Sequence, residues 1–259
     1  MALVHSFEKS GNFLFKYRGQ IPAIIFLIAL PVVFYKAPKL LFFSFSSKFH
    51  IFLQVITVLS VIVSLIGIII RAYAIGTTPH GTSGRNRDKQ LAKQLNTQGI
   101  YSIVRHPLYL GNYFMWAGLL MFTYSVSLFL VVSLVFWLYY ERIMFAEERY
   151  LERQFGEEYL DWSQRVPAFI PRFRQFQKST IPFSLKTVLR REYSGVFALV
   201  LGFTLVDYTR NLGICYFFKE PMQWVRPSLW VLLAFLLLML TLRTLKHHTN
   251  FLNRMENRD

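Results

Sequence analysis

Residues 51–70 read IFLQVITVLSVIVSLIGIII, twenty consecutive residues without a charge. A helix needs about 20 mainly apolar residues to cross the hydrocarbon core of a bilayer, so this stretch predicts a membrane-spanning helix. Working outward, further uncharged runs lie at 21–35, 107–140, 193–206 and 227–242. The long run 107–140 is interrupted by Thr123-Tyr124-Ser125, which predicts a tight hairpin of two short spans. We therefore expect an all-α, polytopic integral membrane protein with about six transmembrane helices.

The composition agrees with a membrane protein. Apolar residues make up 54% of the 259-residue chain and charged residues only 17%, against about 25% in a typical soluble domain. This excludes a disordered chain or an ordinary soluble enzyme. The net charge of +15 does not favour nucleic acid as a partner, because the basic residues flank the spans and form no recognition motif. One cysteine excludes an intramolecular disulfide, and no Cys or His spacing predicts a metal site.

The distribution of Lys and Arg predicts the orientation. With the N-terminus in the cytoplasm, the inside segments carry 23 of the 29 basic residues, as the positive-inside rule requires. Both termini are then cytoplasmic, in a bacterial inner membrane or the endoplasmic reticulum. Segments 71–107 and 141–193 flank the hairpin on this side, so we expect the functional site there. We divide the chain into an N-terminal two-span region (1–70), a core (71–175) and a C-terminal two-span extension with a basic tail (176–259).

The first motif lies at the start of the hairpin. It comprises Gly99-Ile100-Tyr101, then Arg105-His106-Pro107-Leu108-Tyr109-Leu110-Gly111. Proline suits the first position of a helix, which places His106 beside the positive N-terminal end and its free N–H groups. Simple anchoring at the membrane interface is the alternative, since Arg and Tyr favour that depth.

The second motif lies on the helix that leaves the hairpin. It reads Glu147-Glu148-x-x-Leu151-x-x-x-Phe155-Gly156-x-x-Tyr159 and continues to prolines at 167 and 171. Glu147 shares a helical face with Ile143 and Leu151, so a partner for its carboxylate is expected, and a cationic ligand would serve. The alternative is a solvated helix carrying ion pairs.

Together the two motifs resemble the isoprenylcysteine carboxyl methyltransferase family and its phospholipid methyltransferase relatives over about residues 50–171. The resemblance implies a membrane-embedded, cytoplasm-facing site for S-adenosylmethionine (SAM). The cofactor contacts implied by position are Lys93, Gln94, Leu95, Asn96, Tyr101, His106, Pro107, Leu108, Tyr109 and Glu147. At two positions the chain departs from the family: Lys93 replaces a His, and Ile143 replaces the Arg that holds the substrate carboxylate, with Arg142 one residue away.

The resemblance implies SAM-dependent methyl transfer to a membrane lipid or lipidated substrate, with His106, Tyr101 and Arg142 as candidate catalytic residues. Arg142 and the loop residues Arg85 and Arg87 favour an anionic acceptor, a carboxylate or phosphate, because guanidinium groups suit oxyanions. Amine phospholipid headgroups and small thiols stay open as acceptors. A transporter or non-catalytic scaffold is the rival from another class. The role of the C-terminal extension and the oligomeric state are left open by the sequence.

Overall fold

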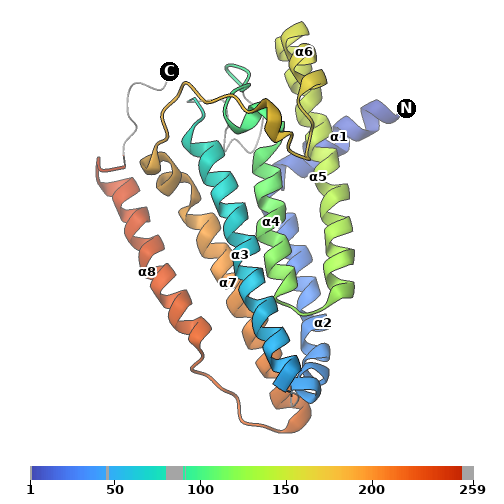
Figure 1. Ribbon diagram of the computed structural model, residues 1–259, viewed down its shortest axis with the longest axis vertical. Coiled ribbons are helices and arrows are strands. Elements are labelled where there is room, and N and C mark those ends of the chain that lie inside the picture. The colour runs from blue at the N-terminus through green and yellow to red at the C-terminus, as the bar shows by residue number, and fades with distance from the viewer. Residues whose placement is uncertain (1, 45–46, 80–89, 91, 253–259) are drawn as a thin grey trace.

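The computed structural model describes residues 2–44, 47–79, 90 and 92–252, and these residues form an elongated helical bundle (Figure 1). The α-helices are α1 (Leu3–Lys16), α2 (Gln20–Ser44), α3 (Ser47–Gly76), α4 (Pro107–Met121), α5 (Val126–Phe155), α6 (Glu157–Arg165), α7 (Leu185–Phe218) and α8 (Pro227–His248). Two short 3₁₀ helices, η1 (Ile100–Ser102) and η2 (Phe173–Gln175), lie between them. The all-α class is confirmed for these residues.

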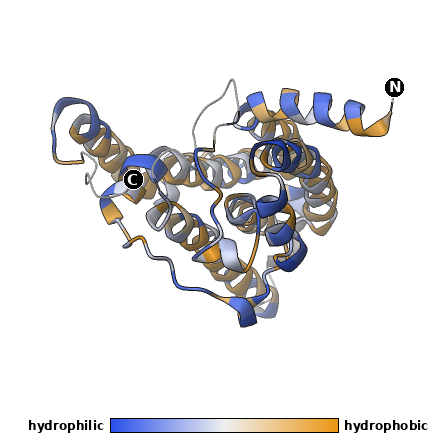
Figure 2. Cartoon of the chain, turned by 90° about the horizontal axis from the view of Figure 1, so that it is seen from above, coloured by the Kyte–Doolittle hydropathy of each residue, from blue (hydrophilic) through white to orange (hydrophobic). Residues whose placement is uncertain are grey.

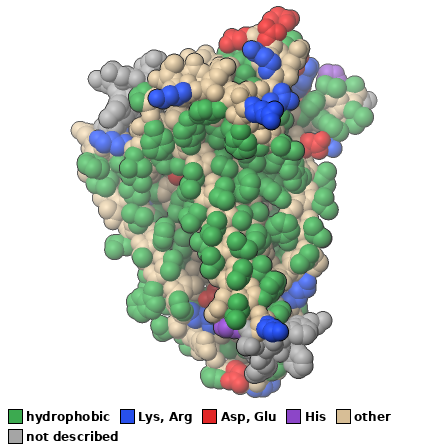
Figure 3. Space-filling view, in the orientation of Figure 1, with side chains coloured by type: hydrophobic (Ala, Val, Ile, Leu, Met, Phe, Trp, Pro, Cys, Tyr) green, Lys and Arg blue, Asp and Glu red, His purple; other side chains and the backbone are tan. Residues whose placement is uncertain are grey.

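Within the described residues, four segments are long and apolar enough to cross a membrane: Gln20–Pro38, Lys48–Gly76, Val126–Phe155 and Pro227–His248. Their length and composition are consistent with a polytopic membrane protein. Helices α4 and α7 run alongside them in the bundle (Figure 1). On the face shown in Figure 3, hydrophobic side chains cover the middle, and Lys, Arg, Asp and Glu gather toward the two ends. Such a band is typical of a protein whose solvent is lipid.

Most helices are longer than the uncharged runs that predicted them. For example, the run 193–206 becomes α7, Leu185–Phe218, and the arm ending at residue 140 continues in α5 to Phe155. Uncharged length marks only the part of a helix that lies in hydrocarbon. Backbone hydrogen bonding continues into the interface, where charged side chains reach water. α2 likewise runs through Pro31 and Pro38.

The predicted hairpin is formed by α4 and α5. Pro107 occupies the first turn of α4 and His106 its N-cap, as the motif indicated. The turn contains Tyr124 with a φ of 55°, and the Ser125 hydroxyl accepts a hydrogen bond from the N–H of Leu128 at 3.3 Å. The Ser125 cap satisfies an otherwise unpaired N–H at the start of α5.

Helix α4 approaches α3 through glycines. A Cβ added at Gly67 would lie 2.5 Å from the carbonyl oxygen of Gly111, and one at Gly118 would overlap the backbone of Ser60 and the hydroxyl of Ser64. The Ser64 hydroxyl donates to the carbonyl of Met115 at 3.1 Å. Small residues that let two backbones approach are a common means of helix association in membranes.

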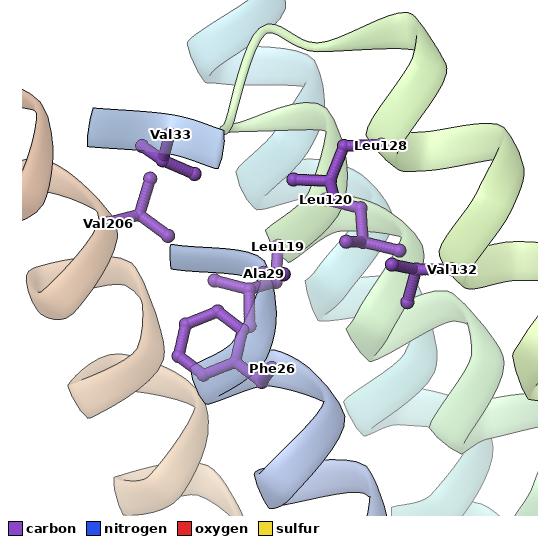
Figure 4. Close-up of a cluster of buried hydrophobic side chains, with 8 residues drawn as sticks. All are labelled: Phe26, Ala29, Val33, Leu119, Leu120, Leu128, Val132 and Val206. Atoms are coloured by element: carbon purple, nitrogen blue, oxygen red, sulfur yellow. The ribbon is translucent and has the colours of Figure 1, made fainter. Parts of the chain in front are cut away.

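A buried apolar cluster joins the C-terminal extension to the rest of the bundle. Figure 4 shows side chains from α2, α4, α5 and α7 meeting in it. Val206 of α7 is fully buried and contributes to this cluster with Val33 of α2 and Leu119 of α4. The extension therefore packs into the bundle.

One end of the molecule carries α1, α6 and η1, and we call it the α6 end. Viewed along the bundle, α1 lies across this end with hydrophilic and hydrophobic residues on different sides (Figure 2). It packs against α5, where Gly11 approaches the carbonyl of Arg142. The segment after α6 then returns across the same end toward α7 (Figure 1). The α6 end is where both sequence motifs lie.

Candidate active site

The residues implied by the resemblance come together around one cavity of about 680 Å³ at the α6 end. Nine of the ten line it: Gln94, Leu95, Asn96, Tyr101, His106, Pro107, Leu108, Tyr109 and Glu147. The tenth, Lys93, is exposed and lies outside the lining. Residues 94–101 and the hairpin thus line a common pocket, although the first and last of the nine residues are some fifty positions apart in the sequence.

Backbone hydrogen bonds hold the first motif in place. The N–H groups of Arg105 and His106 donate to the carbonyls of Pro167 and Ala168, at 2.9 and 3.2 Å. Gly99 has a φ of 59°, a left-handed conformation that favours glycine, and its N–H donates to the carbonyl of Gln177 at 2.9 Å. The segment following α6 therefore fixes the loop that enters α4.

Glu148 is the centre of a charged network in the cavity wall. One carboxylate oxygen lies 2.9 Å from Nε of Arg105 and 2.7 Å from Nε2 of His106. Arg105 also donates from Nη1 to the carbonyl of Ser163 at 2.6 Å and of Val166 at 3.1 Å. A carboxylate can only accept, so Nε2 of His106 is the donor in this contact. Glu148 thereby fixes the imidazole to α5.

Glu147, the neighbouring acid, faces the cavity. Its Oε2 lies 3.7 Å from Nδ1 of His106, and 31% of its side chain is exposed, against 5% for His106. The His106 ring in turn stacks on Tyr109, with ring centroids 5.7 Å apart. Ile143, one turn earlier on α5, is fully buried in an aromatic cluster that also contains Tyr109. Glu147 offers the cavity a negative charge.

Tyr101 lines the cavity from η1. Burial raises the pKa of Tyr101 well above its ordinary value of 10.0, and the nearby carboxylate of Glu147 raises it further. The Tyr101 carbonyl accepts a hydrogen bond from Nε1 of Trp162 at 3.2 Å, which ties η1 to α6. At neutral pH the phenol is protonated, so Tyr101 can offer a hydrogen-bond donor to a ligand in this site.

Of the three arginines expected to meet the acceptor, Arg142 lies within the described residues, and it does not line the cavity. Arg142 lies on the α1 side of α5, with its guanidinium carbon 3.3 Å from the centroid of the Phe7 ring. This contact directs Arg142 toward α1, and Arg142 is absent from the cavity lining. Arg85 and Arg87 lie outside the described residues.

A second buried ion pair lines the cavity, and sequence reasoning missed it. Arg71 donates from Nε and Nη2 to the two oxygens of Glu192, at 2.7 and 2.8 Å, and from Nη1 to Oδ1 of Asn112 at 2.6 Å. The side chains are only 19% and 8% exposed. The sequence did contain a signal for this pair, because Arg71 directly follows the uncharged run 51–70 and Glu192 directly precedes the uncharged run 193–206. The predicted topology places both at one membrane face.

Comparison with known proteins agrees with the motifs. Residues 51–158 match the family model described as phospholipid methyltransferase, so the resemblance is confirmed for this segment. No solved structure gives a significant match. The matched segment contains His106, Glu147 and Glu148, and it ends before α7.

Curated relatives are similar to the chain over about a third of its length. The protein-S-isoprenylcysteine O-methyltransferase of Schizosaccharomyces pombe is 40% identical over 90 residues, 34% of this chain and 36% of that protein. The nickel-cobalt-cadmium resistance protein NccN of Alcaligenes xylosoxydans xylosoxydans is 38% identical over 87 residues, 34% of this chain and 40% of that protein. The methanethiol S-methyltransferase 2 of Bradyrhizobium diazoefficiens is 36% identical over 87 residues, 31% of this chain and 30% of that protein. The chain thus spans less than half the length of these relatives.

Proposed function

We propose that the protein is a SAM-dependent methyltransferase that acts on a lipid-like acceptor at the membrane. The observation that carries the proposal is the convergence of nine implied cofactor residues on one cavity, with Glu147 facing into it. The family match to residues 51–158 and the names of the methyltransferase relatives support the same reaction class.

The cavity residues fit SAM. The volume of about 680 Å³ lies within the roughly 300–1,000 Å³ of small-molecule sites. Glu147 would hold a positively charged part of the cofactor, and Gln94 and Asn96 offer polar groups at the rim. When bound, SAM supplies an already activated methyl group. The protein's task is then to align the acceptor and exclude water.

His106 and Tyr101 have different tasks in this proposal. Tyr101 donates a hydrogen bond and keeps its proton, because the pKa of its phenol is raised. A carboxylate or phosphate acceptor is already deprotonated at neutral pH and needs no base. An amine or thiol acceptor would lose its proton to Nδ1 of His106, the ring atom opposite the nitrogen that Glu148 holds.

We favour an anionic acceptor. Four arginines and three glutamates line the cavity, namely Arg18, Arg71, Arg105 and Arg191, and Glu147, Glu148 and Glu192. Arg85 and Arg87 are further proposed contacts, so changing both to Gln should raise the Michaelis constant for the acceptor and spare SAM binding. The relative named for methanethiol S-methylation keeps a small thiol open, and the family's description keeps a phospholipid headgroup open.

We further propose that six helices, α2, α3, α4, α5, α7 and α8, cross the membrane with the α6 end in the cytoplasm. The 15 residues of α4 cover about 22 Å at 1.5 Å per residue, so the bilayer must thin beside it or flanking residues must contribute. Both chain termini would be cytoplasmic, in a bacterial inner membrane or the endoplasmic reticulum.

Two measurements test the reaction. Titration calorimetry of the detergent-purified protein with SAM should show saturable binding; its absence would contradict the proposal and favour a scaffold or transporter. Membranes incubated with methyl-labelled SAM should then yield a labelled product identifiable by mass spectrometry. Loss of the label in mild base would identify a carboxylate methyl ester, and its retention a methylated phosphate, a methylamine or a thioether, which the mass of the product distinguishes.

A further inference from the structure

The cavity continues beyond the cofactor residues along one face of α7. Besides Arg191 and Leu201, the lining residues of this helix follow a helical spacing: Glu192, Gly195, Ala198, Leu199, Gly202 and Leu205. That spacing places them on one face, and three of them are glycine or alanine. The matched family segment ends at residue 158, so this wall belongs to the C-terminal extension.

The opposite walls of this part of the cavity are apolar. They consist of Pro22, Ala23, Phe26 and Leu27 of α2, and of Met115, Trp116 and Leu119 of α4. At its polar end stands the Arg71–Glu192 pair, in which both carboxylate oxygens meet the guanidinium. The apolar walls beyond this pair suit a hydrocarbon chain, because they offer few hydrogen-bond partners to a charged solute.

Exposed lining residues lie on both α2 and α7. Leu27 lines the cavity and is 55% exposed, and Ala23 and Ala198 are also exposed cavity residues. Leu119 lines the cavity from the inside and is only 4% exposed. A hydrocarbon chain could therefore enter from the bilayer beside α7 and contact Leu119, which the surrounding lipid does not reach.

We propose that the α7 face from Gly195 to Leu205 is the specificity-determining wall of an acceptor chamber, and that the acceptor is an amphiphile with a long hydrocarbon chain. The chain enters between α2 and α7, and its polar head lies at the Arg71–Glu192 end, next to Glu147 and His106. The ten-residue rise from 195 to 205 makes the wall about 15 Å long. This inference rests on the proposed function, because it takes the methyl-transfer site as the polar end of the chamber.

Gly195 is a position at which a larger side chain should obstruct the chamber. A Cβ added there would meet only Oε2 of Glu192, at 3.9 Å, so a larger side chain has room to extend into the cavity. Gly195→Leu should therefore obstruct the chamber without disturbing helix packing. The matched control is Ser194→Leu, one position away on the exposed side of α7. Ala23→Phe, on the facing helix, is a second obstruction that does not depend on Gly195.

The test uses the full-length protein in lipid vesicles and a long-chain fatty acid that carries a diazirine near its methyl end. After photolysis, mass spectrometry should find the label on Leu119 and Met115. Gly195→Leu and Ala23→Phe should lower that labelling at least several-fold while SAM affinity stays within about two-fold of wild type, and Ser194→Leu should leave both unchanged. Gly195→Leu should also move methyl-acceptor preference toward shorter chains.

Each outcome bears on a different statement. Label on Leu119 in a protein that does not bind SAM would overturn the proposed function and keep the chamber. SAM binding without label on Leu119 or Met115, or labelling that neither obstruction lowers, would overturn the chamber and leave the proposed function standing. If Gly195→Leu does not fold, as judged by SAM affinity and melting temperature, Ala23→Phe decides.

Discussion

Glu147 and Glu148 are neighbours on α5, yet their carboxylates meet different surroundings. Glu148 accepts hydrogen bonds from Arg105 and His106 at 2.9 and 2.7 Å, whereas Glu147 is exposed to the cavity. Consecutive helical residues are about 100° apart, so one acid can face the cavity while the next reaches the start of α4. We therefore expect Glu147 to act in binding and Glu148 in positioning.

Replacing Glu147 with Gln should weaken SAM binding while the fold stays intact. Loss of one charge-assisted hydrogen bond costs roughly 1.5–3 kcal/mol, or about 10- to 150-fold in the dissociation constant measured by calorimetry. The matched control is Glu152→Gln, on the same helix, whose carboxylate pairs with Arg149 outside the cavity. Equal SAM affinity in the Glu147 variant and wild type would remove the acid from the proposed site.

Replacing Glu148 with Gln should instead destabilise the α6 end. The substitution leaves Arg105 without its carboxylate, and an unsatisfied buried polar group costs roughly 1–3 kcal/mol. Thermal unfolding in detergent should therefore show a lower melting temperature than for Glu147→Gln. If the two variants melt at the same temperature as wild type, Glu148 does not carry the positioning role.

At the scale of elements, the closeness of α3 and α4 depends on residues without side chains. A methyl group at Gly118 would overlap Ser60 and Ser64 of α3. Since α4 begins at His106 and Pro107, any displacement of α4 from α3 also moves the polar end of the cavity. The packing of this pair is thus connected to the site.

Gly118→Ala should lower the free energy of unfolding by about 1–3 kcal/mol, because overpacking a close contact forces the helices apart. The alanine's better helix propensity offsets less than about 1 kcal/mol of this cost. Thermal unfolding measures the effect, and Gly19→Ala is the control, since a Cβ there would meet no atom within 4 Å. A higher melting temperature for Gly118→Ala than for wild type would contradict the packing argument.

The sequence predicted the elements well and the contacts between them only in part. Uncharged runs indicated each long helix, and Pro107 indicated where α4 begins, because both signals are local. The partnership of Arg71 with Glu192 spans 121 residues and depends on how α7 docks, which no local pattern encodes. Arg142 was expected at the acceptor site because it neighbours Ile143 in the sequence. The one-residue offset on the helix directs its side chain toward Phe7 instead.

At the scale of the whole molecule, the polar end of the cavity, α6 and the return segment all lie at one end of the bundle (Figure 1). The loop between α7 and α8 lies at the other end. There Arg226 pairs with Asp207 at 2.8 Å and holds the start of α8 against α7. A membrane would separate the two ends, so their orientation decides which compartment supplies the cofactor.

The α6 end should face the cytoplasm, because the segments predicted to lie on that side carry 23 of the 29 Lys and Arg residues. Cys215 is the only cysteine in the sequence, so a Cys215→Ala background allows single reporters. Glu158→Cys on α6 and Glu220→Cys in the α7–α8 loop replace exposed residues at opposite ends. In intact bacterial cells expressing the protein, a membrane-impermeant maleimide should label Glu220→Cys and should reach Glu158→Cys only after permeabilisation. Labelling of both after detergent is the control for reactivity. The reverse pattern in intact cells would place the proposed SAM site on the wrong side of the membrane for a cytoplasmic cofactor, and would overturn the orientation together with the site's access to SAM.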